Sequence, residues 1–302
     1  MSNTHEKPRI FPASPKNFKA RPEVRRIGYR EVARRDLYHS LLIIPWPGFF
    51  GLMALAYVTF NLTFAALYFA QAGAIANARP GAFADAFFFS VQTMATIGYG
   101  DMHPITFYAN LVVTVEVLMG LAGLALATGL IFARFSRPTA RVMFSRVAVV
   151  SAYNGVPHLM FRAANQRRNQ ILEAQVSLAL LRDERSAEGI VMRRFHDLAV
   201  ARGRTPMFAL TWTVMHAIDA ASPLHGASPE SLAAQNAEII ITLIGIDETY
   251  AQTIYARHSY AAQDLLWGRR FADILQVMED GTRAIDYRRF HDVVEIEAKR
   301  SD

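Results

Sequence analysis

The stretch Thr96-Ile97-Gly98-Tyr99-Gly100-Asp101 decides the fold because of the segments on either side of it. No charged side chain occurs in residues 48–76, and Glu116 is the only one in residues 105–133. Each segment exceeds the roughly 20 residues that a helix needs to cross the hydrocarbon core of a bilayer. The sequence therefore predicts two membrane-spanning helices with the motif between them.

A shorter helical segment leads into the motif. Residues 82–93 have the composition of a helix but are too few to cross a bilayer, so we expect a re-entrant half-helix. The C-terminal end of a helix carries a partial negative charge. This end lies near Thr93, next to the motif, where it favours a cation.

The motif has the residues needed to hold a dehydrated potassium ion. Rings of backbone carbonyls can replace the hydration shell of such an ion. Gly98 and Gly100 reach backbone angles closed to other residues, so successive carbonyls can face one axis. We therefore predict a K+ selectivity filter at residues 96–101. The K+ ions would bind at Thr96, Ile97, Gly98 and Tyr99, and Gly100 and Asp101 would complete the filter.

One chain supplies only one wall of such a filter. Closing the rings of carbonyls requires several copies around an axis, and four is the number used in the filter chemistry that the motif resembles. We expect a homotetramer, with K+ as the permeant ion and no cofactor. Gly-Tyr-Gly alone is a weak signal, and its position between a half-helix and a second span makes the prediction specific.

The distribution of charge also indicates a membrane protein. The chain of 302 residues is 52% hydrophobic and 19% charged, with a formal net charge of +6. Basic residues are dense in residues 1–35 and resume at Arg134, whereas Arg79 is the only Lys or Arg between the two spans. By the positive-inside rule, both termini are expected in the cytoplasm, and the partner of the basic residues is a membrane and not a nucleic acid. The absence of cysteine excludes disulfides, thiolate metal sites and cysteine nucleophiles.

One face of the second span is expected to line the pore. Its residues recur at steps of three and four, as on one side of a helix. They are Val117, Leu121, Leu124, Thr128, Ile131, Phe132 and Phe135. Leu124 would lie in a central cavity, and Phe132, about two turns farther along, would form a hydrophobic gate. A stripe that packs against another helix is the alternative.

Glu116 is costly in lipid, so it must face protein or water. We place it near the base of the filter and group it with the cavity and gate residues Leu124, Thr128 and Phe132. Two roles stay open for it, structural pairing and attraction of ions. Glycines at 120, 123 and 129 would serve either close helix packing or bending, and the sequence does not distinguish these roles.

Residues 36–47 are expected to form an amphipathic helix at the membrane surface. Apolar side chains at Leu37, Leu41 and Ile44 are spaced for one face, and Pro45-Trp46-Pro47 would end the helix. Trp46 and the basic residues before the helix suit the boundary between water and lipid. The alternative is that this segment is the first turn of the next helix.

From residue 138 onward the sequence is typical of a β-sheet domain. Asn154-Gly155 between two apolar runs is a strong hairpin signal. Apolar residues alternate with others from Ala174 to Leu180, as in a half-buried strand. Further candidate strands are 191–198, 208–214, 238–246, 251–257 and 270–276. We expect an all-β fold of two packed sheets.

These features resemble the prokaryotic inward-rectifier (Kir-type) potassium channels, from about Arg34 to about Asp292. Residues 34–47 look like the slide helix of that family, residues 90–104 like its pore helix and filter, and residues 127–138 like the end of its inner helix. Four stretches resemble its cytoplasmic domain. They are 188–198, 211–226, 252–271 and 285–292.

The resemblance implies a membrane α-helical pore domain followed by an all-β immunoglobulin-like cytoplasmic sandwich. The pore domain would have two transmembrane helices, a re-entrant pore helix and an amphipathic slide helix. The β-domain would extend the ion path and move with the slide helix to open or close an inner gate. We expect a multi-pass protein of the bacterial inner membrane. The expected divisions are a basic arm at 1–35, the slide helix at 36–47, the pore domain at 48–137 and the regulatory domain at 138–302.

The resemblance also implies control by anionic phospholipids. Arg34 and Arg35 before the slide helix, and Arg134 and Arg137 after the inner helix, occupy positions where members of the family meet acidic headgroups. Ordinary positive-inside topology is the alternative explanation of these charges.

Some features depart from the eukaryotic members of the family. The cysteines of their extracellular disulfide are absent, and Gln92 stands where many members have a glutamate behind the filter. Leu124 occupies the cavity position where strongly rectifying members carry an acid. We therefore expect weak rectification.

Three other functions make different demands on the sequence. A two-span receptor with a ligand-binding β-domain would require the filter motif to be incidental. An enzyme would need a nucleophile with its base, a phosphate-binding loop or a metal cluster, and the sequence displays none of these. A non-rectifying potassium channel whose cytoplasmic domain senses a soluble ligand stays open.

Overall fold

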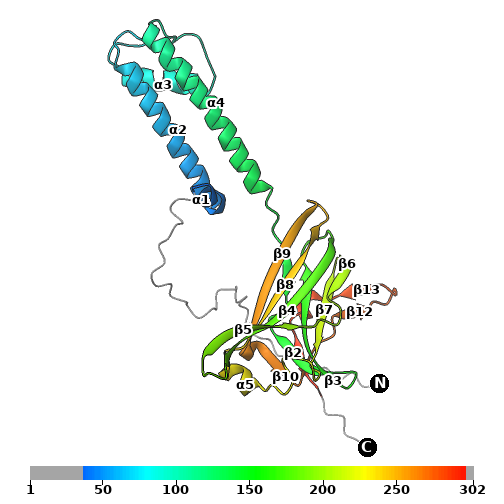
Figure 1. The fold of residues 1–302 in the computed structure, drawn as a ribbon. Helices are drawn as coiled ribbons and strands as arrows, with labels where there is room; N and C mark the ends of the chain where they lie inside the picture. The colour runs from blue at the N-terminus through cyan, green and yellow to red at the C-terminus, as the bar shows by residue number, and fades with distance from the viewer. Residues whose placement is uncertain (1–36, 297–302) are drawn as a thin grey trace, which may run out of the picture. The chain divides into compact units, whose positions relative to one another are not determined.

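The computed structural model describes residues 37–296, so the basic arm with Arg34 and Arg35 lies outside the described residues. The chain forms two compact units (Figure 1). One is helical and ends at Arg137, and the other is rich in β-strands and begins at Pro138.

The described part of the helical unit contains four helices. They are α1 (Leu37–Ile43), α2 (Trp46–Phe69), α3 (Phe83–Met94) and α4 (Phe107–Phe135). α2 and α4, with 24 and 29 residues, are long and apolar enough to cross a membrane. Figure 1 shows α3 between α2 and α4, at the end of the unit far from α1. This order confirms the two predicted spans with a short helix between them.

The bounds of the first two helices differ from the predictions. α1 ends at Ile43, so it is shorter than the predicted 36–47, and a break at residues 44–45 separates it from α2. Trp46 and Pro47 begin α2 instead of ending α1. The first N–H groups of a helix have no partner within the helix, so a proline in the first turn costs no hydrogen bond. α2 ends at Phe69 and not near residue 76, and a turn with Gly73 at φ 72° follows.

α4 begins two residues later than the predicted 105–133 and ends two residues later. Its start is set by Thr106, whose Oγ1 accepts a hydrogen bond from the backbone N–H of Ala109 at 3.1 Å.

A buried apolar cluster joins α2, α3 and α4. Tyr68 of α2 and Phe89 of α3 meet edge to face, with ring centroids 5.0 Å apart. The buried members of the cluster are Phe64, Ala65, Tyr68, Ala74, Ile75, Ala86, Phe89, Ala109 and Val112. This packing fixes α3 against both spans and so positions the residues that follow it.

The β-sheet unit is built around two five-stranded sheets. The first has the order β1-β3-β2-β10, and β7 also pairs with β3. Its strands are β1 (Val142–Phe144), β2 (Ala148–Tyr153), β3 (Val156–Asn165), β7 (Thr211–Ala217) and β10 (Leu265–Trp267). The second has the order β5-β4-β8-β9, and β6 also pairs with β4. Its strands are β4 (Ile171–Arg185), β5 (Val191–Leu198), β6 (Arg204–Phe208), β8 (Glu238–Asp247) and β9 (Gln252–Ala261).

Two small sheets and three short helices complete the described part of this unit. β11 (Arg269–Phe271) pairs with β14 (Val293–Glu295), and β12 (Leu275–Val277) pairs with β13 (Arg283–Ile285). The helices are α5 (Pro229–Ala234) and the 3-10 turns η2 (Ala262–Asp264) and η3 (Tyr287–Arg289).

The two large sheets share one hydrophobic core. The even-numbered residues of β4 from Ala174 to Leu180 are at most 3% exposed, which confirms the predicted half-buried strand. The predicted hairpin is also confirmed, because Asn154 and Gly155 turn the chain between β2 and β3 with φ angles of 52° and 81°. The all-β sandwich expected after residue 138 is therefore present.

Two of the predicted strands are wrong in their bounds. The segment at 208–214 is divided, because Phe208 ends β6 in the second sheet and Thr211 begins β7 in the first. The segment at 270–276 is divided between β11 and β12, which belong to different small sheets. In both segments the chain changes sheet, and the spacing of apolar side chains does not reveal this change.

Candidate functional site

The predicted filter directly follows the C-terminal end of α3. The backbone N–H groups of Ile97 and Gly98 donate to the carbonyl oxygen of Gln92 at 2.8 and 3.4 Å. Thr96, Gly98 and Gly100 have positive φ angles of 57°, 60° and 85°. Left-handed angles at alternate residues depart from the extended backbone in which carbonyls point to opposite sides. The two glycines were expected to adopt such angles, whereas Thr96 was not.

The loops on the far side of the filter are fastened to one another. Asn77 donates from Nδ2 to the carbonyl oxygen of Asp101 at 2.9 Å. The backbone N–H of Ala76 donates to the carbonyl oxygen of His103 at 2.8 Å. Residues before α3 are therefore bonded to residues at and beyond Asp101, which limits the movement of the C-terminal end of the motif.

Four buried polar side chains connect α2, α3 and α4, and we call them the buried network: Asn61, Tyr68, Ser90 and Glu116. Asn61, Ser90 and Glu116 are fully buried, and Tyr68 is 2% exposed. The Ser90 hydroxyl donates to one oxygen of the Glu116 carboxyl, and the Tyr68 hydroxyl donates to the other at 2.6 Å. Asn61 Oδ1 lies 3.1 Å from Ser90 Oγ. All three helices are thus joined by hydrogen bonds in an apolar setting, where unpaired polar groups are costly.

The grouping of Glu116 with the cavity and gate is therefore wrong. Its carboxyl is enclosed within one chain, and both of its oxygens accept hydrogen bonds from hydroxyl groups of the same chain. Of the two roles left open, these contacts support structural pairing. Tyr68 and Ser90 lie 48 and 26 residues away in the sequence, so no local pattern could identify them as its partners.

The other predicted cavity and gate residues lie on exposed parts of α4. Leu124 and Phe132 are 66% and 72% exposed on the single chain, and Thr128 is also exposed. Phe135, predicted on the same face, is 69% exposed and also contacts Trp46, with ring centroids 4.8 Å apart. A run of large exposed apolar side chains indicates a surface that another chain or lipid covers.

Arg134, which was predicted to meet anionic lipid, is half-buried and makes contacts within the protein. Its guanidinium donates to the carbonyl oxygens of Leu41 and Ile44 at 2.6 and 2.5 Å. It also lies over the rings of Trp46 and Phe49, 4.5 and 4.6 Å from their centroids. These carbonyls stand at the C-terminal end of α1, where helical carbonyls lack partners. Arg134 therefore ties α1 to α4, a contact that sequence reasoning missed.

In the β-sheet unit, a buried carboxylate anchors the turn between β8 and β9. Asp247 is 1% exposed and accepts from Arg167 Nη1 and Asn169 Nδ2, both at 2.8 Å. The backbone N–H groups of Thr249 and Tyr250 donate to it at 3.0 and 3.3 Å. Burial raises the pKa of Asp247, and the hydrogen bonds from Asn169, the backbone and Arg167 outweigh burial, so the pKa is lowered. The carboxylate is satisfied by the protein and serves the turn.

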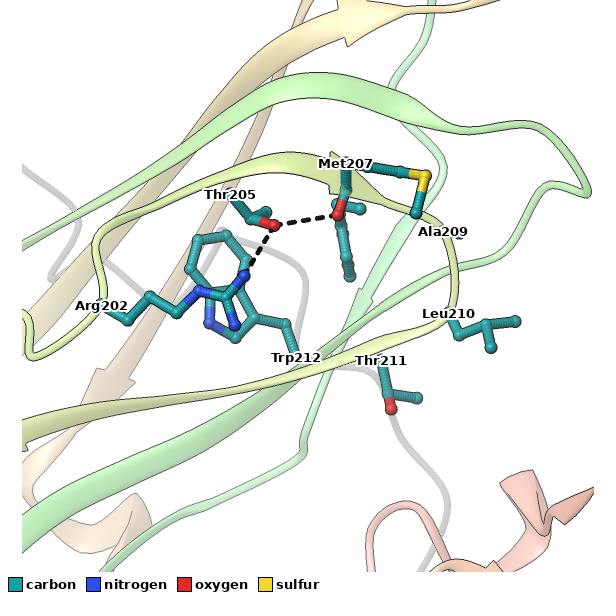
Figure 2. A pocket seen from close by; sticks show the side chains of 8 residues that line it. Arg202, Thr205, Met207, Ala209, Leu210, Thr211 and Trp212 are labelled. Atoms are coloured by element: carbon teal, nitrogen blue, oxygen red, sulfur yellow. Dashed lines mark hydrogen bonds between the residues drawn. The ribbon is translucent and has the colours of Figure 1, made fainter. Parts of the chain in front are cut away.

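A pocket of about 250 Å³ lies at the hairpin between β6 and β7. Figure 2 shows Arg202, Thr205, Met207 and Trp212 among the residues around it. Arg202 Nη2 donates to Thr205 Oγ1 at 3.1 Å, and Thr205 Oγ1 donates to the carbonyl oxygen of Met207 at 2.9 Å. Arg202 and Thr205 are therefore bonded within the pocket wall, and the lining includes none of the predicted pore residues. Across residues 37–296, no group of three or more His, Asp or Glu side chains could hold a metal ion.

Comparison with protein families matches both units. The family described as "Inward rectifier potassium channel C-terminal domain" matches residues 142–301, and the family described as "Ion channel" matches residues 51–137.

Curated relatives match most of the chain. "Inward rectifier potassium channel Kirbac3.1" of Paramagnetospirillum magnetotacticum is 50% identical over 260 residues, which cover 86% of this chain and 88% of the relative. "ATP-sensitive inward rectifier potassium channel 12" of Bos taurus is 31% identical and "G protein-activated inward rectifier potassium channel 3" of Mus musculus is 32% identical, each over 86% of this chain. The matched region covers 66% of the bovine relative and 72% of the mouse relative.

Among solved structures, the sporulation control protein Spo0M of Bacillus subtilis matches 43% of this chain and 50% of its own, with 8% identity and a TM-score of 0.24. A similarity this low carries no argument about the fold.

Proposed function

The chain belongs to the inward rectifier potassium channel family, and from this premise we propose that four copies form one potassium-selective pore in a membrane. K+ ions bind to rings of backbone carbonyls at Thr96, Ile97, Gly98 and Tyr99, and residues 100–101 complete the filter. The activity is passive transport and not catalysis. The observation that carries this proposal is the filter backbone, with its positive φ angles at alternate residues directly after a half-helix.

The exposure of apolar side chains supports assembly around an axis. Tyr99, Leu124 and Phe132 are 75%, 66% and 72% exposed on the single chain. In a tetramer, Leu124 and Thr128 line the cavity beneath the filter, and Phe132 forms the gate nearer the cytoplasm. With no acid at Leu124, the cavity attracts polyamines weakly, and rectification is weak.

Gating uses the slide helix and the regulatory domain. Residues 36–47 lie on the membrane surface, residues 48–137 form the pore domain, and residues 138–302 regulate it. Because Arg134 binds the end of α1, a movement of α1 acts directly on the inner end of α4. Anionic phospholipids act through Arg34, Arg35, Arg134 and Arg137, with both termini in the cytoplasm and the pore in the bacterial inner membrane.

The test is K+ uptake into liposomes that contain the purified protein, with Na+ as competitor and Ba2+ as blocker. Gly98→Ser is expected to abolish selective uptake, because Gly98 has a φ of 60° that side chains rarely adopt. Gly123→Ala is the matched control, since an added Cβ there meets nothing within 4 Å. No uptake in any lipid mixture would instead support the receptor alternative, and uptake without K+ selectivity would contradict the proposed filter.

A further inference from the structure

Gly120 of α4 touches the last residue of α3. A Cβ added at Gly120 would lie 2.8 Å from the carbonyl oxygen of Met94 and 3.1 Å from Met94 Cγ. The carbonyl belongs to the backbone, so it cannot move away unless the end of α3 moves with it. An added Cβ at Gly123 or Gly129 would meet nothing within 4 Å. Of these three glycines, Gly120 alone is required by a close contact between helices.

Glu116 precedes Gly120 by one helical turn and therefore lies on the same side of α4. Its carboxyl accepts one hydrogen bond from the Ser90 hydroxyl, in the middle of α3, and another from the Tyr68 hydroxyl of α2. In the interior of a membrane unit no water is at hand to replace these partners. The carboxyl is satisfied only while α3 stays at the depth where Ser90 reaches it.

Met94 is held from α2 as well. Asn61 Nδ2 donates to Met94 Sδ at 3.5 Å. The first filter residue, Thr96, comes two positions later, and its backbone N–H donates to the carbonyl oxygen of Thr93 at 3.0 Å. A displacement of Met94 would therefore move the filter as well, because only Ala95 separates Met94 from Thr96.

We propose that Glu116 and Gly120 form a socket on α4 that sets the depth of α3 and, through Met94, the spacing of the filter carbonyls. Gly120 is a glycine because a backbone carbonyl passes at contact distance, and not because α4 bends there. Both are positioning residues that act on the filter through α3. This inference rests on the proposed channel function.

The test compares the K+/Na+ permeability ratio, obtained from reversal potentials of the purified protein in planar bilayers. Gly120→Ala pushes the end of α3, and Ser90→Ala removes the hydrogen bond to Glu116 without adding volume. Ser90→Ala is expected to lower the ratio by about tenfold, the effect of losing one hydrogen bond to a buried polar partner. Gly120→Ala is also expected to lower the ratio, through the collision of its Cβ with the carbonyl oxygen of Met94. Gly123→Ala, on the same helix, is expected to leave the ratio unchanged.

The outcomes separate the socket from the channel function itself. Unselective current through the unmodified protein would overturn the proposed function. With a selective unmodified protein, an unchanged ratio in Ser90→Ala overturns the socket, even where Gly120→Ala fails to assemble. An altered open probability with unchanged selectivity in Gly120→Ala would assign Gly120 to bending and also overturn it. Equal losses in Gly120→Ala and Gly123→Ala would show that the contact with Met94 is not the cause.

Discussion

Arg134→Ala should release α1 from α4. The guanidinium of Arg134 binds the carbonyl oxygens of Leu41 and Ile44 at 2.6 and 2.5 Å, and it lies 4.5 Å from the centroid of Trp46. Alanine removes all of these contacts and leaves the carbonyls at the end of α1 without partners. α1 has only seven residues, which is too short to stay helical without docking.

The size of the effect follows from these contacts. A hydrogen bond from a charged donor contributes about 1.5–3 kcal/mol, and a cation–π contact at an exposed site contributes about 0.5–1 kcal/mol. Arg134 is only half-buried, so the lower values apply, and its two hydrogen bonds with its contacts to the rings of Trp46 and Phe49 total about 4 kcal/mol. A change of this size raises the undocked fraction of α1 by about a thousandfold.

Hydrogen exchange of the full-length protein in lipid nanodiscs, read by mass spectrometry on peptides that cover α1, measures this fraction. The amides of α1 should exchange much faster in Arg134→Ala than in the unmodified protein. Arg137→Ala is the matched control, because it removes the same charge from an exposed position three residues along. Equal protection of α1 in both variants would refute the proposed role of Arg134.

Three further outcomes test the β-sheet unit and the pore. Burial lowers the pKa of His258 from 6.5 to about 4, so the fold favours the neutral ring and should lose stability as pH falls from 6.5 towards 4. Thermal melts of His258→Phe should lack that part of the pH dependence, and identical profiles would contradict the assignment. Gly245→Ala should lower the melting temperature because its Cβ would collide with the Ile171 side chain, whereas Gly203→Ala, with its nearest neighbour at 3.5 Å, should not. Leu124→Asp should strengthen voltage-dependent block by spermine in bilayer recordings, and robust block of the unmodified channel would count against weak rectification.

The features that could be predicted from the sequence are those that depend only on residues close together along the chain. The absence of charge over residues 48–76 identifies a span without any knowledge of its neighbours. The same holds for Asn154-Gly155 and for the alternation along β4, which depend on turn geometry and on side-chain period alone. The filter motif could also be predicted from consecutive residues, because glycine permits backbone angles that other residues rarely adopt.

The contacts that sequence reasoning missed join residues that are distant along the chain. A periodic face shows that a helix packs, but not which helix it meets, so the partners of Glu116 and of Arg134 stayed hidden. The role of Gly120 was undecided for the same reason, since only the carbonyl of Met94 distinguishes it from Gly123. Phe208 and Thr211 were joined into one strand because an apolar run does not reveal where a chain changes sheet.

In the proposed channel, four chains surround K+ with the carbonyls of one filter. The most direct measurement is anomalous diffraction from crystals of the full-length protein in which Tl+ replaces K+. We expect Tl+ sites on a fourfold axis, ringed by the carbonyl oxygens of Thr96, Ile97, Gly98 and Tyr99. A different number of chains around the axis, or an axis with no ordered Tl+ between these residues, would contradict the proposed tetrameric filter.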